Sequence, residues 1–305
     1  MKVLVTGGAG FIGSHVVDKL IQEKYQVVII DNLSTGLQEN INPSATFFQL
    51  DIRSEEVLTL FMCEKFDFVI HLAAQTMVHK SLETPSYDCD INVMGTVNIL
   101  EACRKTGVKR IVFSSTAAVY GNVTTLPVME TNQKAPTSFY GLSKLTCENY
   151  LSLYKEVYGL DYMILRYANV YGERQGDGGE GGVISIFTRK ISQDQSVLIF
   201  GDGSQTRDFI YVGDVANANY QSLLVGSANK ICNISTQIET SVNSLIDHIG
   251  MISGKMVSRN YNEKREGDIY KSSLSNAIAR KDLDWQPHMT LIEGLDKTYH
   301  SLSKL

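Results

Sequence analysis

Hydrophobic positions in the first half of the chain form short, nearly continuous runs separated by segments with helical spacing. The apolar runs have the length of strands and cover 1–6, 26–30, 46–50, 67–72, 110–113 and 162–165. Amphipathic segments lie between them, over 14–23, 54–64, 87–105 and 138–158. Apolar strands that alternate with helices indicate a parallel sheet covered on both faces. The pattern therefore predicts an α/β fold with a doubly wound parallel sheet.

The pattern changes after Arg166. A polar, glycine-rich stretch covers 173–182, and the elements beyond it are shorter and mixed. A length of 305 residues suits one large α/β unit or two domains. We predict a larger domain over 1–170 and a smaller mixed α/β domain over 171–305, with some elements returning to the first.

The turn after the first strand is rich in glycine. Gly7 permits a tight turn, Gly10 lets the backbone approach a pyrophosphate, and Gly13 lets the following helix pack closely on the strand. The start of that helix offers free N–H groups to phosphates. Asp31 ends the second strand, 18 residues after Gly13 (31 − 13), where a carboxylate accepts from ribose hydroxyls and repels a 2′-phosphate. The segment predicts a site for NAD rather than NADP.

Polar or small residues stand at the carboxyl ends of most of the predicted strands, where ligands bind in parallel sheets. These residues are Thr6, Asp31, Asp51, Ala73 and Ser114 to Thr116.

A phenol and an ammonium lie four residues apart at Tyr140 and Lys144. On a helix these side chains share a face. A nearby positive charge favours the phenolate, which can take a hydroxyl proton as hydride leaves the same carbon. Thr116 can orient that hydroxyl. Taken alone, a Tyr and a Lys at this spacing usually lie on a solvated helix face. Here the NAD site and the strand that ends in Thr116 make a catalytic role the better interpretation.

Composition narrows the class of protein further. A net charge of −5 gives no case for nucleic acid or an acidic membrane surface. The five cysteines show no metal-binding spacing, so we expect no metal site and a reducing cytoplasm. No apolar stretch is long enough to span a bilayer, and the apolar start has strand length, so we expect neither a membrane anchor nor a signal peptide.

Several motifs resemble those of the extended short-chain dehydrogenase/reductases, and most closely the UDP-glucose 4-epimerase family of nucleotide-sugar epimerases. The likeness covers nearly the whole chain and rests on segments 6–13, 114–121, 140–144, 166–172, 201–212 and 265–268.

This resemblance implies a Rossmann-type fold, NAD as cofactor, a UDP-sugar substrate and a set of binding residues. Those for NAD are Gly7, Gly10, Phe11, Ile12, Gly13, Asp31, Asn32, Asp51, Ile52, Leu72, Ala73, Ala74, Asn92, Ser114, Tyr140, Lys144 and Tyr167. Those for the substrate are Thr116, Tyr140, Asn169, Gly182, Val183, Phe200, Arg207, Arg265, Asp268 and Ser272.

Residues of the second half fit a nucleotide diphosphate on chemical grounds as well. Arg207 and Arg265 would supply forked cationic donors, and Asp268 could accept from a ribose. Phe200 could cover a base, although a core position is the simpler interpretation for it alone.

Relatives that catalyse other reactions carry an extra carboxylate near the position of Thr116. The 4,6-dehydratases have Asp-Glu directly after it, and the UDP-glucuronate decarboxylases have Glu two places on. Here the next residues are Ala117 and Ala118, which favours a 4-epimerase acting through a 4-keto intermediate. The alternatives are an epimerase for UDP-glucuronate or UDP-pentoses, a nucleotide-sugar reductase, and a catalytically idle NAD-binding sensor.

The resemblance implies three finer features. Ser272 matches a position beside the sugar's C2 substituent, and a small residue there leaves room for N-acetyl, so we expect activity on UDP-GlcNAc and UDP-GalNAc. The helices over 87–105 and 138–158 resemble those that pair in family homodimers. The segment 75–81 differs from the commonest forms of a loop that faces the sugar, and we expect His79 in it to be a surface residue.

Overall fold

The computed structural model describes residues 1–176, 182–224, 226, 228–264 and 270–303. Its main strands are β1 (Lys2–Thr6), β2 (Gln26–Asp31), β3 (Thr46–Gln49), β4 (Phe68–His71), β5 (Arg110–Thr116), β6 (Asp161–Tyr167) and β10 (Lys230–Ile234). In this part of the chain they form one parallel sheet of seven strands, in the order β10-β6-β5-β4-β1-β2-β3. The predicted fold class is confirmed. The strand order reverses beside β1, where such sheets bind their ligands.

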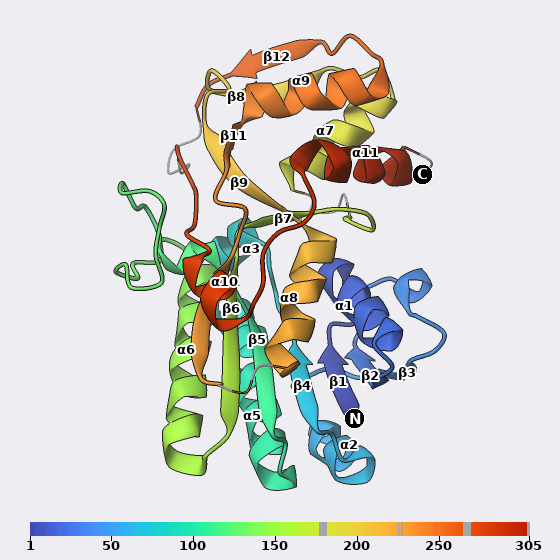
Figure 1. Ribbon diagram of the computed structural model, residues 1–305, viewed down its shortest axis with the longest axis vertical. Helices are drawn as coiled ribbons and strands as arrows, with labels where there is room; N and C mark the ends of the chain where they lie inside the picture. The colour runs from blue at the N-terminus through green and yellow to red at the C-terminus, as the bar shows by residue number, and fades with distance from the viewer. Residues whose placement is uncertain (177–181, 225, 227, 265–269, 304–305) are drawn as a thin grey trace.

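Helices cover both faces of this sheet (Figure 1). One face carries α1 (Phe11–Gln22) and α8 (Val212–Leu224), and the other carries α2 (Glu56–Glu64), α5 (Gly95–Thr106) and α6 (Phe139–Tyr158). The central strands are buried on both sides, and Val3, Leu4 and Val5 of β1 are wholly inaccessible. This explains why their sequences read as continuous apolar runs rather than alternating ones.

Two predicted helices begin at other residues than expected, and a third is interrupted. The first helix begins at Phe11 rather than Ser14, because Gly10 already has the extended backbone of an N-cap. The second begins at Glu56, and Ser54 precedes it, accepting a hydrogen bond from the Glu56 N–H at 3.2 Å.

The third helix, predicted over 87–105, is not one regular helix. A π-helical turn (Asp90–Met94) separates α4 (Pro85–Cys89) from α5. Within the turn the Asn92 carbonyl accepts from the Thr96 hydroxyl at 2.5 Å and from the Cys147 thiol at 3.2 Å. Side chains thus satisfy a carbonyl in the turn, where regular helical bonding is interrupted.

The remaining elements form a smaller part with a core of its own, at the top of Figure 1. A three-stranded sheet contains β7 (Asn169–Tyr171), β9 (Thr206–Tyr211) and β11 (Glu239–Ser241), in the order β11-β9-β7. A parallel pair joins β8 (Val197–Phe200) to β12 (Arg259–Asn262). Three helices pack on them, namely α7 (Val183–Ser192), α9 (Val242–Ser253) and α11 (Leu291–Leu302).

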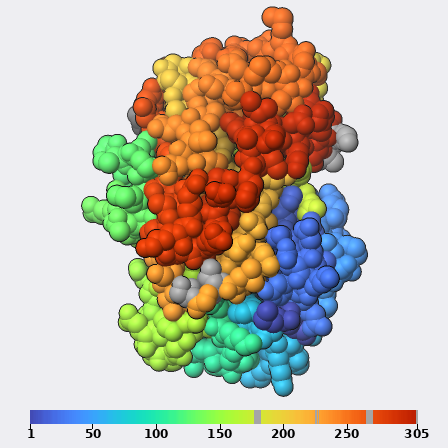
Figure 2. Space-filling view, in the orientation of Figure 1, coloured from blue at the N-terminus to red at the C-terminus, as the bar shows by residue number. Residues whose placement is uncertain are grey.

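The chain passes between the two parts more than once. The short helix α3 (Val78–Glu83) follows β4, and α10 (Ala277–Asp282) lies beside β10 of the main sheet. Beyond α10, the Trp285 indole donates to the Asp214 carbonyl at 3.0 Å, and the His288 and Met289 N–H groups donate to the Asp214 carboxylate. Figure 2 shows the C-terminal segment, in red, spread over the middle of this face. The division into two domains near residue 170 stays a prediction.

Candidate active site

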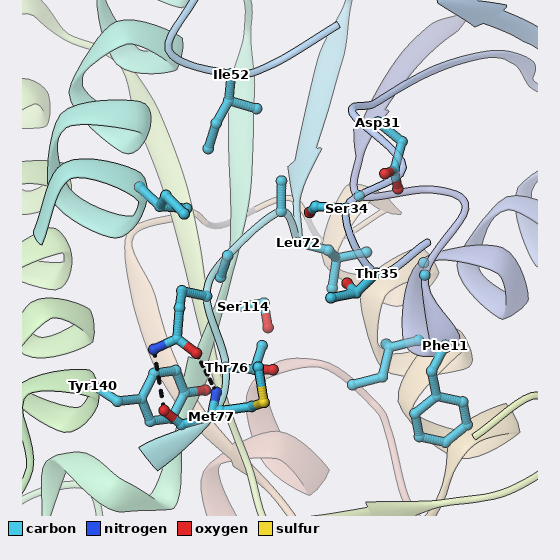
Figure 3. Close-up of a pocket in the computed structure, with 18 of the residues that line it drawn as sticks. Phe11, Asp31, Ser34, Thr35, Ile52, Leu72, Thr76, Met77, Ser114 and Tyr140 are labelled. Carbon is cyan, nitrogen blue, oxygen red and sulfur yellow. Dashed lines mark hydrogen bonds between the residues drawn. The ribbon is translucent and has the colours of Figure 1, made fainter. Parts of the chain in front are cut away.

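A cavity of about 410 Å³ runs along the carboxyl ends of β1, β2, β4, β5 and β6 (Figure 3). Its volume lies in the range of small-molecule sites. It brings together the predicted residues Gly7, Gly10, Phe11, Ile12, Gly13, Asp31, Asn32, Asp51, Ile52, Leu72, Ala73, Ala74, Ser114, Thr116, Tyr140, Lys144 and Tyr167. These residues are far apart in the sequence and share one wall because parallel strands all end at the same edge.

The glycine turn forms a cradle that larger residues would fill. Gly7 has a φ of +71°, and a Cβ on it would lie 2.8 Å from the Ala73 nitrogen. A Cβ on Gly13 would lie 2.0 Å from the Gly7 carbonyl oxygen, and one on Gly10 would lie 3.2 Å from that oxygen. No side chain caps the start of α1. The backbone N–H groups there suit a pyrophosphate, so this end of the cavity fits NAD.

Asp31 is held in place at the end of β2. Its carboxylate accepts from the Ala9 N–H at 3.0 Å and from the Leu33 N–H at 2.9 Å. Burial raises its pKa, and both backbone hydrogen bonds oppose that shift. A Cβ on Gly36 would lie 2.9 Å from each carboxylate oxygen. The Gly36 turn therefore packs closely against this carboxylate, whose negative charge favours ribose hydroxyls over a 2′-phosphate.

Asp51 lies beside Asn32, whose amide donates to it at 2.9 Å. The Arg53 guanidinium donates to both carboxylate oxygens, at 2.9 and 2.8 Å. This pairing holds the pKa of Asp51 well below its usual range, so it stays an anion at neutral pH.

Tyr140 and Lys144 face the other end of the cavity from the first two turns of α6. Ser138 caps this helix by accepting from the Gly141 N–H at 3.1 Å. The Lys144 ammonium is only 3% exposed, donates to the Ser114 carbonyl at 2.9 Å and lies 4.8 Å from the centre of the Phe113 ring. Burial lowers its pKa to about 8, and nearby Cys147, Asp88 and Glu148 oppose that shift. Tyr140 is therefore one helical turn from a buried cation that donates to a neutral carbonyl.

Asn92 does not line the cavity, although we predicted that it contacts the cofactor. It is buried behind the wall, where its amide accepts from the Gln75 N–H at 2.8 Å and donates to the Gln75 carbonyl at 3.0 Å. The Gln75 side chain in turn accepts from the Met77 N–H at 2.6 Å and donates to the Met77 carbonyl at 3.1 Å (Figure 3). Asn92 thus fixes the loop that presents Thr76 and Met77 to the cavity.

Some lining residues lay outside the predicted set, among them Ser34, Thr35, Met77 and Gln175. Met77 belongs to the loop predicted to face the sugar. Ser34 and Thr35 follow the acid that ends β2, so their nearness to Asp31 was a usable signal. Gln175 carried no such signal. His79, expected at the surface, is exposed.

Those predicted substrate residues of the second half that the structure describes lie outside this cavity. Asn169 is exposed and donates to the Asp208 carbonyl at 3.3 Å, and Gly182 and Val183 begin α7. Phe200 ends β8, Arg207 lies in β9, and Ser272 is half-buried before Leu274. Arg265 and Asp268 fall outside the described residues. Their roles in binding a nucleotide stay predictions.

Two further findings concern the part of the chain that the structure describes. None of its helices is long and apolar enough to cross a membrane. None of its groups of His, Cys, Asp and Glu side chains could hold a metal ion.

Known proteins resemble the chain over almost its full length. The model of the NAD dependent epimerase/dehydratase family matches residues 3–235. A Methanocaldococcus jannaschii protein provisionally named UDP-glucose 4-epimerase is 51% identical over 97% of this chain and 96% of its own length.

Solved structures agree with this. The Thermotoga maritima UDP-glucose 4-epimerase with UDP-glucose has a TM-score of 0.97 at 44% identity, covering 100% of this chain and 99% of that one. The Methanobrevibacter ruminantium UDP-N-acetylglucosamine 4-epimerase in complex with UDP-N-acetylmuramic acid has a TM-score of 0.95 at 35% identity, with the same coverage.

The lowered pKa of Lys144 predicts a pH-dependent stability in the cofactor-free protein. The folded pKa is about 8, against about 10.4 in an unfolded chain. Between these values the unfolded state binds more protons, so stability rises with pH. The cost of burying the ammonium is complete below about pH 8 and absent above about pH 10.4.

We therefore expect wild type to gain up to about 3 kcal/mol of unfolding free energy relative to Lys144→Met between pH 7 and pH 10.4. Urea unfolding at several pH values measures this difference. Lys155→Met, at a partly exposed site on the same helix, is the control and should not show it. A pH-independent difference for Lys144→Met would show that the folded pKa is not lowered.

Proposed function

The chain belongs to the NAD dependent epimerase/dehydratase family, and on that premise we propose that it is an NAD-dependent UDP-hexose 4-epimerase. Its reaction interconverts UDP-glucose and UDP-galactose. One observation carries this choice within the family. Thr116, Tyr140 and Lys144 line one cavity, while the positions after Thr116 hold Ala117 and Ala118 instead of carboxylates. The site has the groups for moving a hydroxyl proton and lacks the extra acid that elimination requires.

Bound NAD supplies a reversible acceptor for the hydride on the sugar carbon. Gly7, Gly10 and the start of α1 hold its pyrophosphate, and Asp31 holds a ribose. Tyr140 takes the proton of the sugar hydroxyl and later returns it. Lys144 favours the phenolate form of Tyr140 through its positive charge. Thr116 accepts a hydrogen bond from the Ala118 N–H at 3.2 Å, which orients its hydroxyl group at the wall.

Removing the Tyr140 hydroxyl should remove the proton acceptor. We expect Tyr140→Phe to lower kcat for UDP-galactose by a factor on the order of 10²–10⁴. Thr116→Ala should lower it less, and Lys144→Ala should weaken both NAD binding and turnover. Tyr150→Phe is the matched control, since Tyr150 is exposed on the same helix. An unchanged kcat in Tyr140→Phe would exclude this mechanism.

Substrate breadth is proposed to depend on Ser272. The backbone beside it is fixed, because Val128 N–H donates to the Ser273 carbonyl at 2.9 Å and Leu274 N–H donates to Asp208 at 3.2 Å. The segment therefore cannot shift to make room for a larger side chain at position 272. A small serine leaves room for an acetamido group.

We expect turnover of UDP-glucose, UDP-galactose, UDP-GlcNAc and UDP-GalNAc, measured by separating the 4-epimers. Parallel assays with NAD⁺ and NADP⁺ should show a requirement for NAD⁺ and no net consumption of it, unlike a reductase.

Ser272→Tyr should abolish activity on the N-acetylated pair of substrates and spare the other pair, while Lys271→Tyr, at an exposed neighbour, is the control. Equal loss on both pairs would refute the role of Ser272.

We also propose an isologous homodimer formed through α6 and the helical segment from α4 to α5. Leu142, Leu153 and Val157 of α6 are about half exposed, as is Met94 in the π-helical turn. The α6 residues recur at helical spacing, which leaves an apolar stripe on its outer face.

Light scattering at micromolar concentration should give the mass of a dimer. Leu153→Glu with Val157→Glu should give a monomer, because two charges would be buried at the interface. Met251→Glu, at an exposed position of α9, should leave the mass unchanged. A monomeric wild type would contradict the proposal.

A cytoplasmic location is proposed on the chemistry of the thiols. All five cysteines are free, as expected in a reducing compartment. Cell fractionation against cytoplasmic and secreted markers tests this, and recovery with the secreted marker would exclude it.

A further inference from the structure

The proposed reaction needs two side chains from separate elements at one sugar hydroxyl. Tyr140 comes from α6, and Thr116 ends β5. The distance between them therefore depends on how the helix is fixed against the end of the strand. The role that we assign to the contacts setting this distance rests on the proposed function.

Two side-chain hydrogen bonds join α6 to adjacent residues of β5. The Lys144 ammonium donates to the Ser114 carbonyl at 2.9 Å, and the Ser115 hydroxyl donates to the Glu148 carboxylate at 2.5 Å. Glu148 follows Lys144 by one helical turn, and Lys144 follows Tyr140 by one turn, so all three share a face of α6. The bond between Ser115 and Glu148 therefore reaches the same face of α6 that carries Tyr140 and Lys144.

Glu148 is itself held from β6. The Arg166 Nε donates to one of its carboxylate oxygens at 2.9 Å, and a terminal nitrogen of Arg166 donates to the other at 2.5 Å. Arg166 pairs with Ser115 across the two strands, so both side chains meet the carboxylate from the same face of the sheet. Each of the three residues is 3% exposed or less, and water does not compete for these bonds.

The Ser115 bond is not needed to satisfy the ion pair. Arg166 already occupies both oxygens of Glu148, so the buried charges are paired without the hydroxyl. The bond has instead a consequence for the next residue. Side chains alternate along a strand, so Ser114 and Thr116 point to the face opposite Ser115. Anchoring Ser115 on one face fixes the direction of Thr116 on the other.

We propose that Ser115 and Glu148 are positioning residues, which hold Thr116 at the sugar hydroxyl bound beside Tyr140. Ser115 borders the cavity, but it is only 2% exposed and its hydroxyl donates to Glu148, which does not line the cavity. We therefore expect neither side chain to touch the substrate. Their effect on the reaction passes through Thr116.

Ser115→Ala tests this directly, because it leaves the Glu148–Arg166 pair intact. We expect kcat for UDP-galactose to fall roughly tenfold, since a small misplacement of a reacting group is costly, while KM changes less than about twofold. In a Thr116→Ala background the same substitution should change kcat by less than about twofold. A structural role alone would not produce this dependence on Thr116.

The matched control is Ser222→Ala. Ser222 is fully buried, and its hydroxyl donates to the Ala218 carbonyl within its own helix at 2.8 Å. It should leave kcat unchanged in both backgrounds. An equal loss from Ser115→Ala in both backgrounds, or a lower melting temperature with an unchanged kcat, would overturn the proposal.

A second measurement does not depend on the substrate. Crystal structures of wild type and Ser115→Ala should show the Thr116 side chain displaced relative to the Tyr140 hydroxyl. Identical positions would overturn the proposal. A wild type without epimerase activity would refute the proposed function, and the two crystal structures would still decide the role of Ser115.

Discussion

The buried ion pair between Glu148 and Arg166 is the constraint on which much of the structure depends. Buried charges require close pairing, and removing one partner costs about 3–5 kcal/mol. This pair joins α6 to β6 and, through Ser115, to β5. Arg166 also donates to the Tyr120 hydroxyl at 2.8 Å, and that hydroxyl donates to Asn233 of β10 at 2.7 Å. One polar chain therefore fixes the helix with the proposed catalytic residues and the strand that returns late in the sequence.

Six of the seven strands described in the main sheet could be predicted because their information is local, whereas β10 returns late in the chain and was not predicted. Each central strand is buried on both faces and reads as an unbroken apolar run, as in Val3 to Val5. The glycine turn could also be recognised in the sequence, because its geometry admits only glycine. The space for a Cβ at Gly13, for example, is already taken by the Gly7 carbonyl. Parallel strands then force their carboxyl ends to one edge, which brought most of the predicted cofactor residues to one cavity.

Other features depend on contacts between distant residues, which local patterns do not encode. The π-helical turn follows from side chains that take up the Asn92 carbonyl, one of them 55 positions away on α6. Asn92 braces Gln75 behind the cavity wall, and its contact with the cofactor stays a prediction. Asn233 donates to the Ser275 carbonyl at 3.2 Å, across 42 positions. This bond helps to hold the segment after Ser272, and no spacing in the sequence predicts it.

Buried contacts also determine that His71, which lies near Lys144, carries no charge at neutral pH. The Thr6 hydroxyl accepts from the Leu72 and Ala73 N–H groups, so its own proton goes to His71 Nδ1 at 2.7 Å. His71 Nε2 then carries the proton and donates to Thr96 at 3.0 Å. Burial, with the nearby Lys144, lowers the pKa of His71 to about 3, so it is neutral at neutral pH.

Lys144 supplies the positive charge beside Tyr140, although burial works against it. Glu148 opposes that effect on the pKa of Lys144, while it also pairs Arg166 and accepts from Ser115. The same carboxylate thus helps to keep the ammonium protonated and fixes the strand end opposite it. An apolar pair of equal volume in place of Glu148 and Arg166 would fill the space behind the cavity wall. Such a pair would neither favour the protonated form of Lys144 nor fix the strand end.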